Sequence, residues 1–530
     1  MIKFGKGVVK CRFLILILAF LLLIPSAIGY MKTRINYDIL SYLPGQIETM
    51  KGQDILLDEF GTGAFSFVVV EGMQDKDLQK IADKIEDVPH VKNVIWYGSV
   101  MDFSIPREAL PDDIYNFFNN KDADSQLMAV LFDESMSSDG TMDAIQTIND
   151  LVGKQCFVSG MASVNNDIRK LAENESVIYV LIAVVLSLIV LSLTMDSVVV
   201  PFLFLISIGM AIIYNLGSNV FFGEISYITK ALAAVLQLGV TMDYSIFLLS
   251  SYEENKERFP DDRERAMGHA IANTFKSIVG SSVTTIAGFA ALCFMTFALG
   301  RDLGIVSAKG VVIGVICCVT VLPAMILIFD KPIEKTKHKP LIKSMDRLSG
   351  FITKHYKIWL VIFLVLLAPA IYGNSNTKIY YNIAKSLPST LESNVANEKL
   401  EEDFDMSVLH MVMMDKNMDA KDKRDMLNAI DEVDGVKWTI SLNSLVGATI
   451  PDSMIPKDIK SMLQSDNWEL AFVCSKYQSA TEEVNSQIAQ INDIVKGYDE
   501  NAMVIGEAPM MKDLEDVTNI DLQSVNTVSM

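Results

Sequence analysis

The sequence predicts a polytopic α-helical membrane protein that carries two α+β domains outside the membrane. Half of the 530 residues are hydrophobic and the mean hydropathy is +0.30, which is too apolar for one soluble core. Long apolar runs alternate with acidic polar blocks, and the two largest polar blocks resemble each other. The chain is therefore expected to divide into membrane segments and two exported domains.

Seven apolar runs are long enough to cross a hydrocarbon core of roughly 30 Å, which takes about 20 helical residues. They lie near residues 11–30, 175–194, 198–215, 227–250, 277–298, 304–329 and 356–373. We expect the first membrane helix within residues 1–30, the second to sixth within 175–329, and the seventh at 356–373.

The distribution of Lys and Arg predicts the orientation, because short cytoplasmic loops are enriched in these residues. Three basic clusters occur: Lys3, Lys6, Lys10 and Arg12; Lys256, Arg258, Arg263, Arg265 and Lys276, expected to fill a loop; and Lys331, Lys335, Lys337, Lys339, Lys343, Arg347, Lys354 and Lys357, in and beside a linker at 330–355. Seven spans threaded in order put all three clusters on one side, with a cytoplasmic N-terminus. The polar blocks 31–174 and 374–521 then face outward.

The first apolar run has a second interpretation. Ala27 and Gly29 form a small-residue pattern after a basic start and an apolar stretch, as in a cleaved signal peptide. An uncleaved anchor is favoured, because a matching hydrophobic segment precedes the second polar block. Both interpretations export the first block.

An internal repeat of about 345 residues is the strongest sign of organisation. Three segments return in the second half of the chain. "YDILSYLP", ending at Pro44, returns as "YNIAKSLP", ending at Pro388. "VKNVIWYGSV" from Val91 returns as "VKWTISLNSL" from Val436, and "VSGMASVNNDI" from Val158 returns as "VIGEAPMMKDL" from Val504. By this repeat, residues 522–530 begin an eighth helix. We expect the sequence to be a fragment of a protein with twelve spans, longer by roughly 170 residues.

Strand-like and helix-like segments alternate within each block. In the first block we expect strands at 65–72, 91–99, 126–134 and 156–160, and helices at 75–88, 106–118 and 142–153. In the second block we expect strands at 407–414, 436–442, 469–475 and 502–506, and helices at 421–433, 456–464 and 482–497. This order predicts two-layer domains of the split βαβ kind. The strands are apolar on both faces and too short for an outer-membrane barrel.

Composition excludes several classes of function. Residues 31–175 hold 25 Asp and Glu against 12 Lys and Arg, and this acidic balance argues against nucleic acid as a partner. The six cysteines have no metal-type spacing, and the exported blocks show no recognisable catalytic constellation. We expect neither an enzyme nor a bound metal or cofactor; an intramembrane aspartyl protease would need a second facing aspartate.

Asp243 is the most informative residue for function, because it interrupts the fourth apolar run in "LGVTMDYSIFLLSSYEE". A charged carboxylate within the hydrocarbon costs about 3 kcal/mol and therefore needs a partner or water. Desolvation makes its reversible protonation near neutral pH plausible. Tyr244 can donate a hydrogen bond, while Gly239 and Phe247 lie one turn away on the same face. The alternative is that Asp243 only hydrogen-bonds a neighbouring helix.

Other polar residues in the apolar runs are weaker candidates. Lys230 and Lys309 lie in outer turns, where a long side chain can extend to the interface. The fifth run carries a small polar face that favours helix packing and could contact Asp243, made of Ser281, Ser282, Thr284 and Thr285 with Gly280 and Gly288.

These motifs resemble the MmpL branch of the resistance-nodulation-division (RND) transporter superfamily. The resemblance covers essentially the whole chain and includes "GVTMDYSIFL" in the fourth span, "SIVGSSVTTIAGFAAL" in the fifth and "GIVSAKGVVIGVICCVTVLPAMI" in the sixth. It implies porter-like α+β domains and proton-driven export of hydrophobic or lipid-like compounds from the bacterial cytoplasmic membrane. By this match Asp243 carries the proton and Tyr244 is its hydrogen-bonding companion.

The resemblance also implies a second Asp-Tyr pair in a tenth helix, which the repeat would place near residue 589. That helix lies outside the sequence, so no second pair can be assigned. Expected partners are the lipid bilayer, protons and a hydrophobic substrate, with a homo-oligomer as a further possibility. A non-transporting membrane sensor or scaffold, sterol-sensing-like or an accessory of protein export, shares this helical arrangement and stays the alternative.

Overall fold

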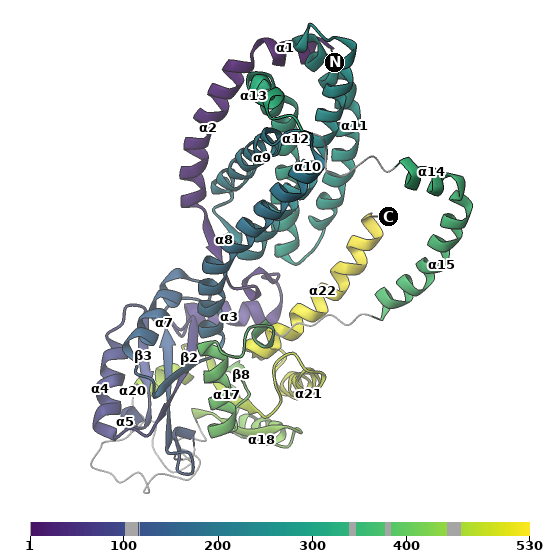
Figure 1. The fold of residues 1–530 in the computed structure, drawn as a ribbon. Helices are drawn as coiled ribbons and strands as arrows, with labels where there is room; N and C mark the ends of the chain where they lie inside the picture. The colour runs from purple at the N-terminus through teal and green to yellow at the C-terminus, as the bar shows by residue number, and fades with distance from the viewer. Residues whose placement is uncertain are drawn as a thin grey trace. The chain divides into compact units, whose positions relative to one another are not determined.

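The computed structural model describes residues 2–100, 115, 117–338, 346–376, 383–442 and 457–529 (Figure 1). The chain divides into two compact units. The helical unit comprises Met1–Arg34, Ser176–Cys293 and Leu303–Tyr380, and the α+β unit comprises Ile35–Glu175, Phe294–Asp302 and Tyr381–Met530.

Seven helices in the described residues are long and apolar enough to cross a membrane, which confirms the predicted number of spans. They are α2 (Arg12–Lys32), α8 (Met161–Thr194), α9 (Val199–Gly217) with the 3₁₀ turn η3 (Ser218–Phe222), α10 (Tyr227–Arg258), α11 (Arg263–Leu292), α12 (Ala298–Ile328) and α15 (Tyr356–Ser375). Shorter helices are α1 (Ile2–Lys10), α13 (Asp330–Lys335) and α14 (Asp346–Lys354), and strand β7 (Glu224–Ser226) follows η3.

The helical unit is held together by an apolar core and by close contacts at glycines. Phe204, Leu248 and Leu322 are fully buried in a cluster shared by α9, α10 and α12. A Cβ added to Gly29 of α2 would collide with the backbone of Gly217 on α9. Small residues at such crossings let membrane helices approach closely, where packing rather than water exclusion drives association.

The loop expected after the fourth apolar run is much shorter than predicted. The basic residues assigned to a loop lie on helices instead, because α10 continues to Arg258 and α11 already begins at Arg263. The connecting loop is residues 259–262, and the Asp262 side chain caps α11 by accepting a hydrogen bond from the Arg265 N–H at 2.9 Å. Both helices extend beyond their apolar parts as charged turns, which a hydropathy pattern does not include.

The first block of the α+β unit contains an antiparallel sheet in the order β3-β5-β2-β6. Its strands are β2 (Ala64–Glu71), β3 (Val91–Ile95), β5 (Ser125–Phe132) and β6 (Cys156–Ser159), and β4 (Asn119–Asn120) pairs with β5. Helices α4 (Asp75–Glu86) and α7 (Asp139–Leu151) cover one face through a core that includes Val68, Ile85 and Ile145.

The second block contains a sheet of the same order, β9-β10-β8-β11, again antiparallel. The strands are β8 (Val408–Asp415), β9 (Val436–Ile440), β10 (Trp468–Ser475) and β11 (Met503–Ile505), with helices α18 (Ala420–Asp431), α20 (Lys457–Leu463) and α21 (Glu482–Tyr498). The matching order supports the interpretation of the two blocks as a repeat. Their duplication stays a prediction.

All eight strands expected in the two blocks are present, with differences at some ends. The strand expected at 91–99 ends at Ile95, because α5 (Tyr97–Val100) begins there, and most of the helix expected at 106–118 lies outside the described residues. Helices α8 and α22 (Glu507–Ser529) begin about four turns before the spans expected at 175 and 522. The first block thus leads into α8, and the second block into α22, without a break in the helix.

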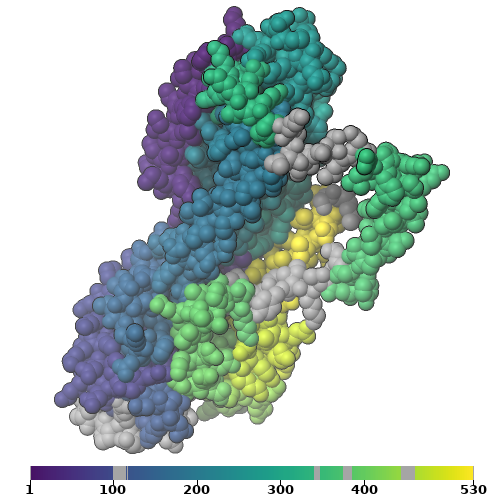
Figure 2. Space-filling view, in the orientation of Figure 1, coloured from purple at the N-terminus to yellow at the C-terminus, as the bar shows by residue number. Residues whose placement is uncertain are grey.

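Several short elements were not predicted, among them β1 (Arg34–Asn36), η1 (Leu40–Tyr42), α3 (Glu48–Asp58), α16 (Ile383–Ser386) and α17 (Glu392–Phe404). Two of them, α3 and α17, each pack on the sheet of the other block, so the blocks exchange these helices. Helix α3 of the first block packs on β11 of the second sheet, where a Cβ on Gly52 would collide with Ile505. Helix α17 of the second block packs on β6 of the first sheet, and Asn397 Oδ1 accepts a hydrogen bond from the Gly160 N–H at 3.0 Å. The space-filling view shows α17 in green beside the first block (Figure 2).

Candidate functional site

Asp243 lies near the middle of α10 and its side chain is exposed on the described helical unit. Within the described residues its carboxylate has no hydrogen bond or ion pair. Phe247, one turn further on, is 60% exposed, and a Cβ on Gly239 would meet nothing within 4 Å. These three residues share one open helix face, and the described structure brings no other helix close to Gly239.

Tyr244 points to a different side of α10 from Asp243, because adjacent residues of an α-helix are about 100° apart. Its side chain is 4% exposed and packs in the apolar cluster of the helical unit. The hydroxyl is buried and has no hydrogen-bond partner among the described residues. The structure therefore does not join the Tyr244 hydroxyl to the Asp243 carboxylate.

The small polar residues of α11 form hydrogen bonds within their own helix. Ser282 is buried and donates to the Ile278 carbonyl at 2.6 Å. Thr284 and Thr285 donate to the Ser281 carbonyl at 2.7 and 3.1 Å. No hydrogen bond from these four residues to Asp243 occurs in the described structure, and this pattern favours a packing role.

A buried polar cluster between α9, α10 and α12 was missed by the sequence analysis. Asn215 Nδ2 donates to Gln237 Oε1 at 3.1 Å, and Gly310 leaves room for both amides. The Lys309 ammonium donates to Asn219 Oδ1, and its extension to a membrane interface stays a prediction. The sequence does contain a sign of this cluster, because Gln237, Thr241 and Ser245 follow one another at four-residue spacing and so share one face of a helix. In the structure all three are buried on α10.

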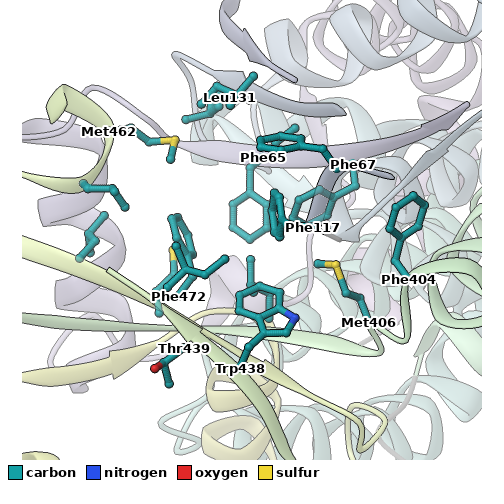
Figure 3. A pocket seen from close by; sticks show the side chains of 18 of the residues that line it. Phe65, Phe67, Phe117, Leu131, Phe404, Met406, Trp438, Thr439, Met462 and Phe472 are labelled. Carbon is teal, nitrogen blue, oxygen red and sulfur yellow. The ribbon is translucent and has the colours of Figure 1, made fainter. Parts of the chain in front are cut away.

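The α+β unit contains a partly open cavity of about 620 Å³ between the two sheets (Figure 3). Seven aromatic side chains line it: Phe65, Phe67, Phe117, Phe118, Phe404, Trp438 and Phe472. Figure 3 shows Phe65, Phe67 and Phe117 facing Trp438 and Phe472 across the space. Phe117 and Trp438 touch edge to face, with ring centroids 5.4 Å apart.

The alternation of apolar residues along β2 explains how this cavity forms. Val68 and Val70 point into the core beneath α4 and α7, while Phe65 and Phe67 point to the opposite face. A strand that is apolar on both faces needs cover on both. The apolar character of both faces is visible in the sequence, but it does not show that the second face lines a cavity.

Charged residues lie at one side of the cavity, all of them from the second block. The Lys437 ammonium pairs with the Asp405 carboxylate. Asp431 Oδ2 accepts a hydrogen bond from the Thr439 hydroxyl at 3.0 Å. Partial burial raises the pKa of the Asp431 carboxyl, and the bond from Thr439 opposes this effect. The cavity thus combines an aromatic interior with a polar side.

Comparison with known proteins places these features in a family of membrane proteins. The chain is 22% identical to the siderophore exporter MmpL5 of Mycobacterium tuberculosis over 426 residues, 73% of this chain and 43% of that protein. It is 25% identical to a membrane protein of Bacillus subtilis, YdgH, over 413 residues, 73% of this chain and 44% of that protein. The chain thus spans less than half the length of these relatives.

The family model named MMPL matches residues 46–349, which are more than half of the chain. The match includes most of the first α+β block and the helices α8 to α12 with Asp243. On this evidence the chain belongs to the MMPL family, as its resemblance to MmpL proteins predicted.

Proposed function

We propose that the chain is part of a proton-driven transporter that exports hydrophobic or lipid-like compounds across the bacterial cytoplasmic membrane. The observation that carries this proposal is the aromatic cavity of about 620 Å³, which both α+β blocks build together. Apolar pockets of this size with a few polar groups are typical ligand sites. Membership of the MMPL family and the name of the relative MmpL5, a siderophore exporter, support transport as the activity.

In this proposal the seven apolar helices cross the membrane and the α+β unit is exported. The three basic clusters of the sequence then lie on the cytoplasmic side. A hydrophobic compound would enter the cavity from the outer leaflet, and relative movement of the two blocks would open and close the cavity.

Asp243 would supply the coupling to the proton gradient. A carboxylate facing hydrocarbon costs several kcal/mol, so its exposed face on α10 would pack against a further helix or a second copy of the chain. Protonation removes the charge and changes the preference for that contact. A group whose charge state favours one of two arrangements can shift the equilibrium between them.

The proposal predicts that Asp243→Asn abolishes gradient-driven transport. Inside-out membrane vesicles that contain the protein are loaded with the neutral aromatic fluorophore N-phenyl-1-naphthylamine, and a pH gradient is applied. The fluorescence change that reports movement of the probe should be lost in Asp243→Asn, because an amide cannot carry a proton. Size-exclusion profiles should show that the variant is inserted and folded.

Glu257→Gln is the matched control, because Glu257 is an exposed carboxylate further along the same helix. It should transport at the wild-type rate. Normal transport by Asp243→Asn would refute the proton-relay role. Binding of the fluorophore without any gradient-dependent movement in the wild type would favour a membrane sensor over a transporter.

A further inference from the structure

The polar groups of the cavity come from one side of it. Asp405 directly follows the last residue of α17, and Asp431 is the last residue of α18. The first block contributes mainly aromatic and aliphatic side chains, with Thr62 as a small polar exception. A ligand that fills the space therefore meets apolar walls at one end and carboxylates at the other.

The two carboxylates differ in how their charge is balanced. Asp405 is paired with Lys437, so this pair adds little net charge. Asp431 has a single hydrogen-bond partner, Thr439, and no Lys, Arg or His of the described residues forms an ion pair with it. The cavity thus carries one carboxylate whose charge is not neutralised by a neighbouring side chain.

Helix dipoles make the same side of the cavity more negative. The C-terminal end of an α-helix carries a partial negative charge of about half an elementary charge, which favours a cation nearby. Both α17 and α18 end at residues that line or adjoin the cavity. A carboxylate at such an end adds to the dipole, and no cation of the described chain offsets Asp431.

The surrounding protein also favours cations over anions. Residues 31–175 hold 25 Asp and Glu against 12 Lys and Arg, and residues 383–529 hold 27 against 12. An acidic surface raises the local concentration of cations and lowers that of anions near a site.

We propose that the cavity selects amphiphiles that carry a cationic group, holding the apolar part among the aromatic side chains and the cation beside Asp431. This inference rests on the proposed function, because it takes the cavity to be the binding site for transported compounds. Neutral compounds of similar shape bind more weakly, and anionic ones bind weakest.

Three probes with the same apolar body and different charge test this selection: diphenylhexatriene, its trimethylammonium derivative and its propionic acid derivative. Binding to the protein in nanodiscs is followed by energy transfer from tryptophan, since Trp438 lines the cavity. Partition into the lipid is the same for the wild type and each variant, so differences between them report the cavity. The cationic probe should bind about fivefold to tenfold more tightly than the anionic one, as expected for one unpaired charge at a few Å.

Asp431→Asn should remove most of this preference and leave the affinity for the neutral probe unchanged. Asp434→Asn is the matched control, because Asp434 pairs with Lys476 and does not line the cavity. Equal binding of all three probes, or an equal effect of Asp431→Asn on each, would overturn the charge selection alone. If Trp438→Ala leaves energy transfer to the neutral probe unchanged, the cavity is not a ligand site and the proposed function itself loses its support.

Discussion

Asp38 shows how one buried residue makes the stability of the α+β unit depend on pH. Its carboxyl is fully buried and accepts a hydrogen bond from the Leu40 N–H at 3.0 Å, and burial raises its pKa from 3.8 to about 6. A raised pKa means that the folded state binds the proton more tightly than the unfolded state. The stabilisation is complete below pH 3.8 and is lost as the pH rises to 6, at a cost of about 3 kcal/mol at neutral pH.

We predict that Asp38→Asn raises the unfolding temperature at pH 7 and has little effect at pH 4. An amide oxygen can still accept the Leu40 hydrogen bond, while the buried charge is removed. Tryptophan fluorescence measures unfolding of this unit, because Trp96, Trp438 and Trp468 all lie in it. An equal shift of the unfolding temperature at both pH values would contradict the prediction.

The unfolding temperature of the variant must be compared with that of the wild type at each pH. A second buried group, His410, makes the stability depend on pH in the opposite direction. Burial lowers the pKa of His410 to about 4, although Gln487 Oε1 accepts a hydrogen bond from the ring Nε2 at 3.3 Å, which opposes this shift. A lowered histidine pKa stabilises the folded state above pH 6.5, and this stabilisation is lost as the pH falls to 4. The wild-type profile therefore sums two opposing slopes.

Single residues also show where sequence patterns stop being informative. The pattern correctly placed Asp243 in an apolar helix, because a charge in a hydrophobic run is visible in the sequence. Helix geometry also predicts that the side chains of Asp243 and Tyr244 point to different sides of α10, because they are adjacent in the sequence. The expected hydrogen bond between them did not take this into account. The contact between Asn215 and Gln237 could not be predicted from the sequence, because a contact between two helices depends on their packing and not on spacing within either one.

At the scale of elements, helices α3 and α17 are among those that begin without a side-chain cap from their own N-cap residue. Helix α3 follows Ile47 and helix α17 follows Leu391, and neither side chain can accept a hydrogen bond from the first turn. Carboxylates from far along the chain bind both first turns: Asp167 Oδ2 caps α17 by accepting from the Ser393 N–H at 2.9 Å, and Asp513 Oδ2 accepts from the Thr49 hydroxyl of α3 at 2.6 Å. Asp513 lies on α22, which follows the second block, and Asp167 lies on α8, which follows the first block. Each carboxylate therefore binds a helix of the other block.

We predict that Asp167→Ala destabilises α17 by about 1 kcal/mol, the usual cost of a lost cap. Hydrogen exchange measured by mass spectrometry should speed up in peptides covering residues 392–404 and stay unchanged in 48–58. Asp513→Ala is the reciprocal variant and should speed up exchange in 48–58 instead. The same exchange pattern in both variants would show that these carboxylates do not stabilise separate helices.

Sequence patterns predicted most elements because periodicity is local. The strands of both sheets and the helices α4, α7, α18 and α21 were found within a few residues of their observed ends. The early starts of α8 and α22 were missed, because polar helical turns precede the apolar part. Helices α3 and α17 were missed because their apolar faces cover the sheet of the other block, which no local pattern records.

At the scale of the whole molecule, this exchange packs side chains of each block into the other. Leu56 and Phe60 belong to the first block, yet they are buried in a cluster with Met413, Leu470 and Ile505 of the second. The cavity is lined from both sheets, so it exists only while the blocks are joined. A cavity of this kind follows from tertiary packing and could not be predicted from either block alone.

We predict that Phe60→Ala loosens the second sheet although Phe60 lies in the first block. Phe60 is 4% exposed, and truncation of such a side chain costs about 3–5 kcal/mol. Hydrogen exchange should speed up in peptides covering β8 and β11, whose residues contact it.

Ile148→Ala separates this effect from a general loss of stability. Ile148 is also fully buried, but its cluster lies beneath the first sheet, so exchange should speed up in β2, β5 and β6 first. If Phe60→Ala instead affects only the first sheet, the blocks unfold independently and the shared cluster does not couple them. Coupling through α3 and α17 would mean that a displacement of either block moves both walls of the cavity.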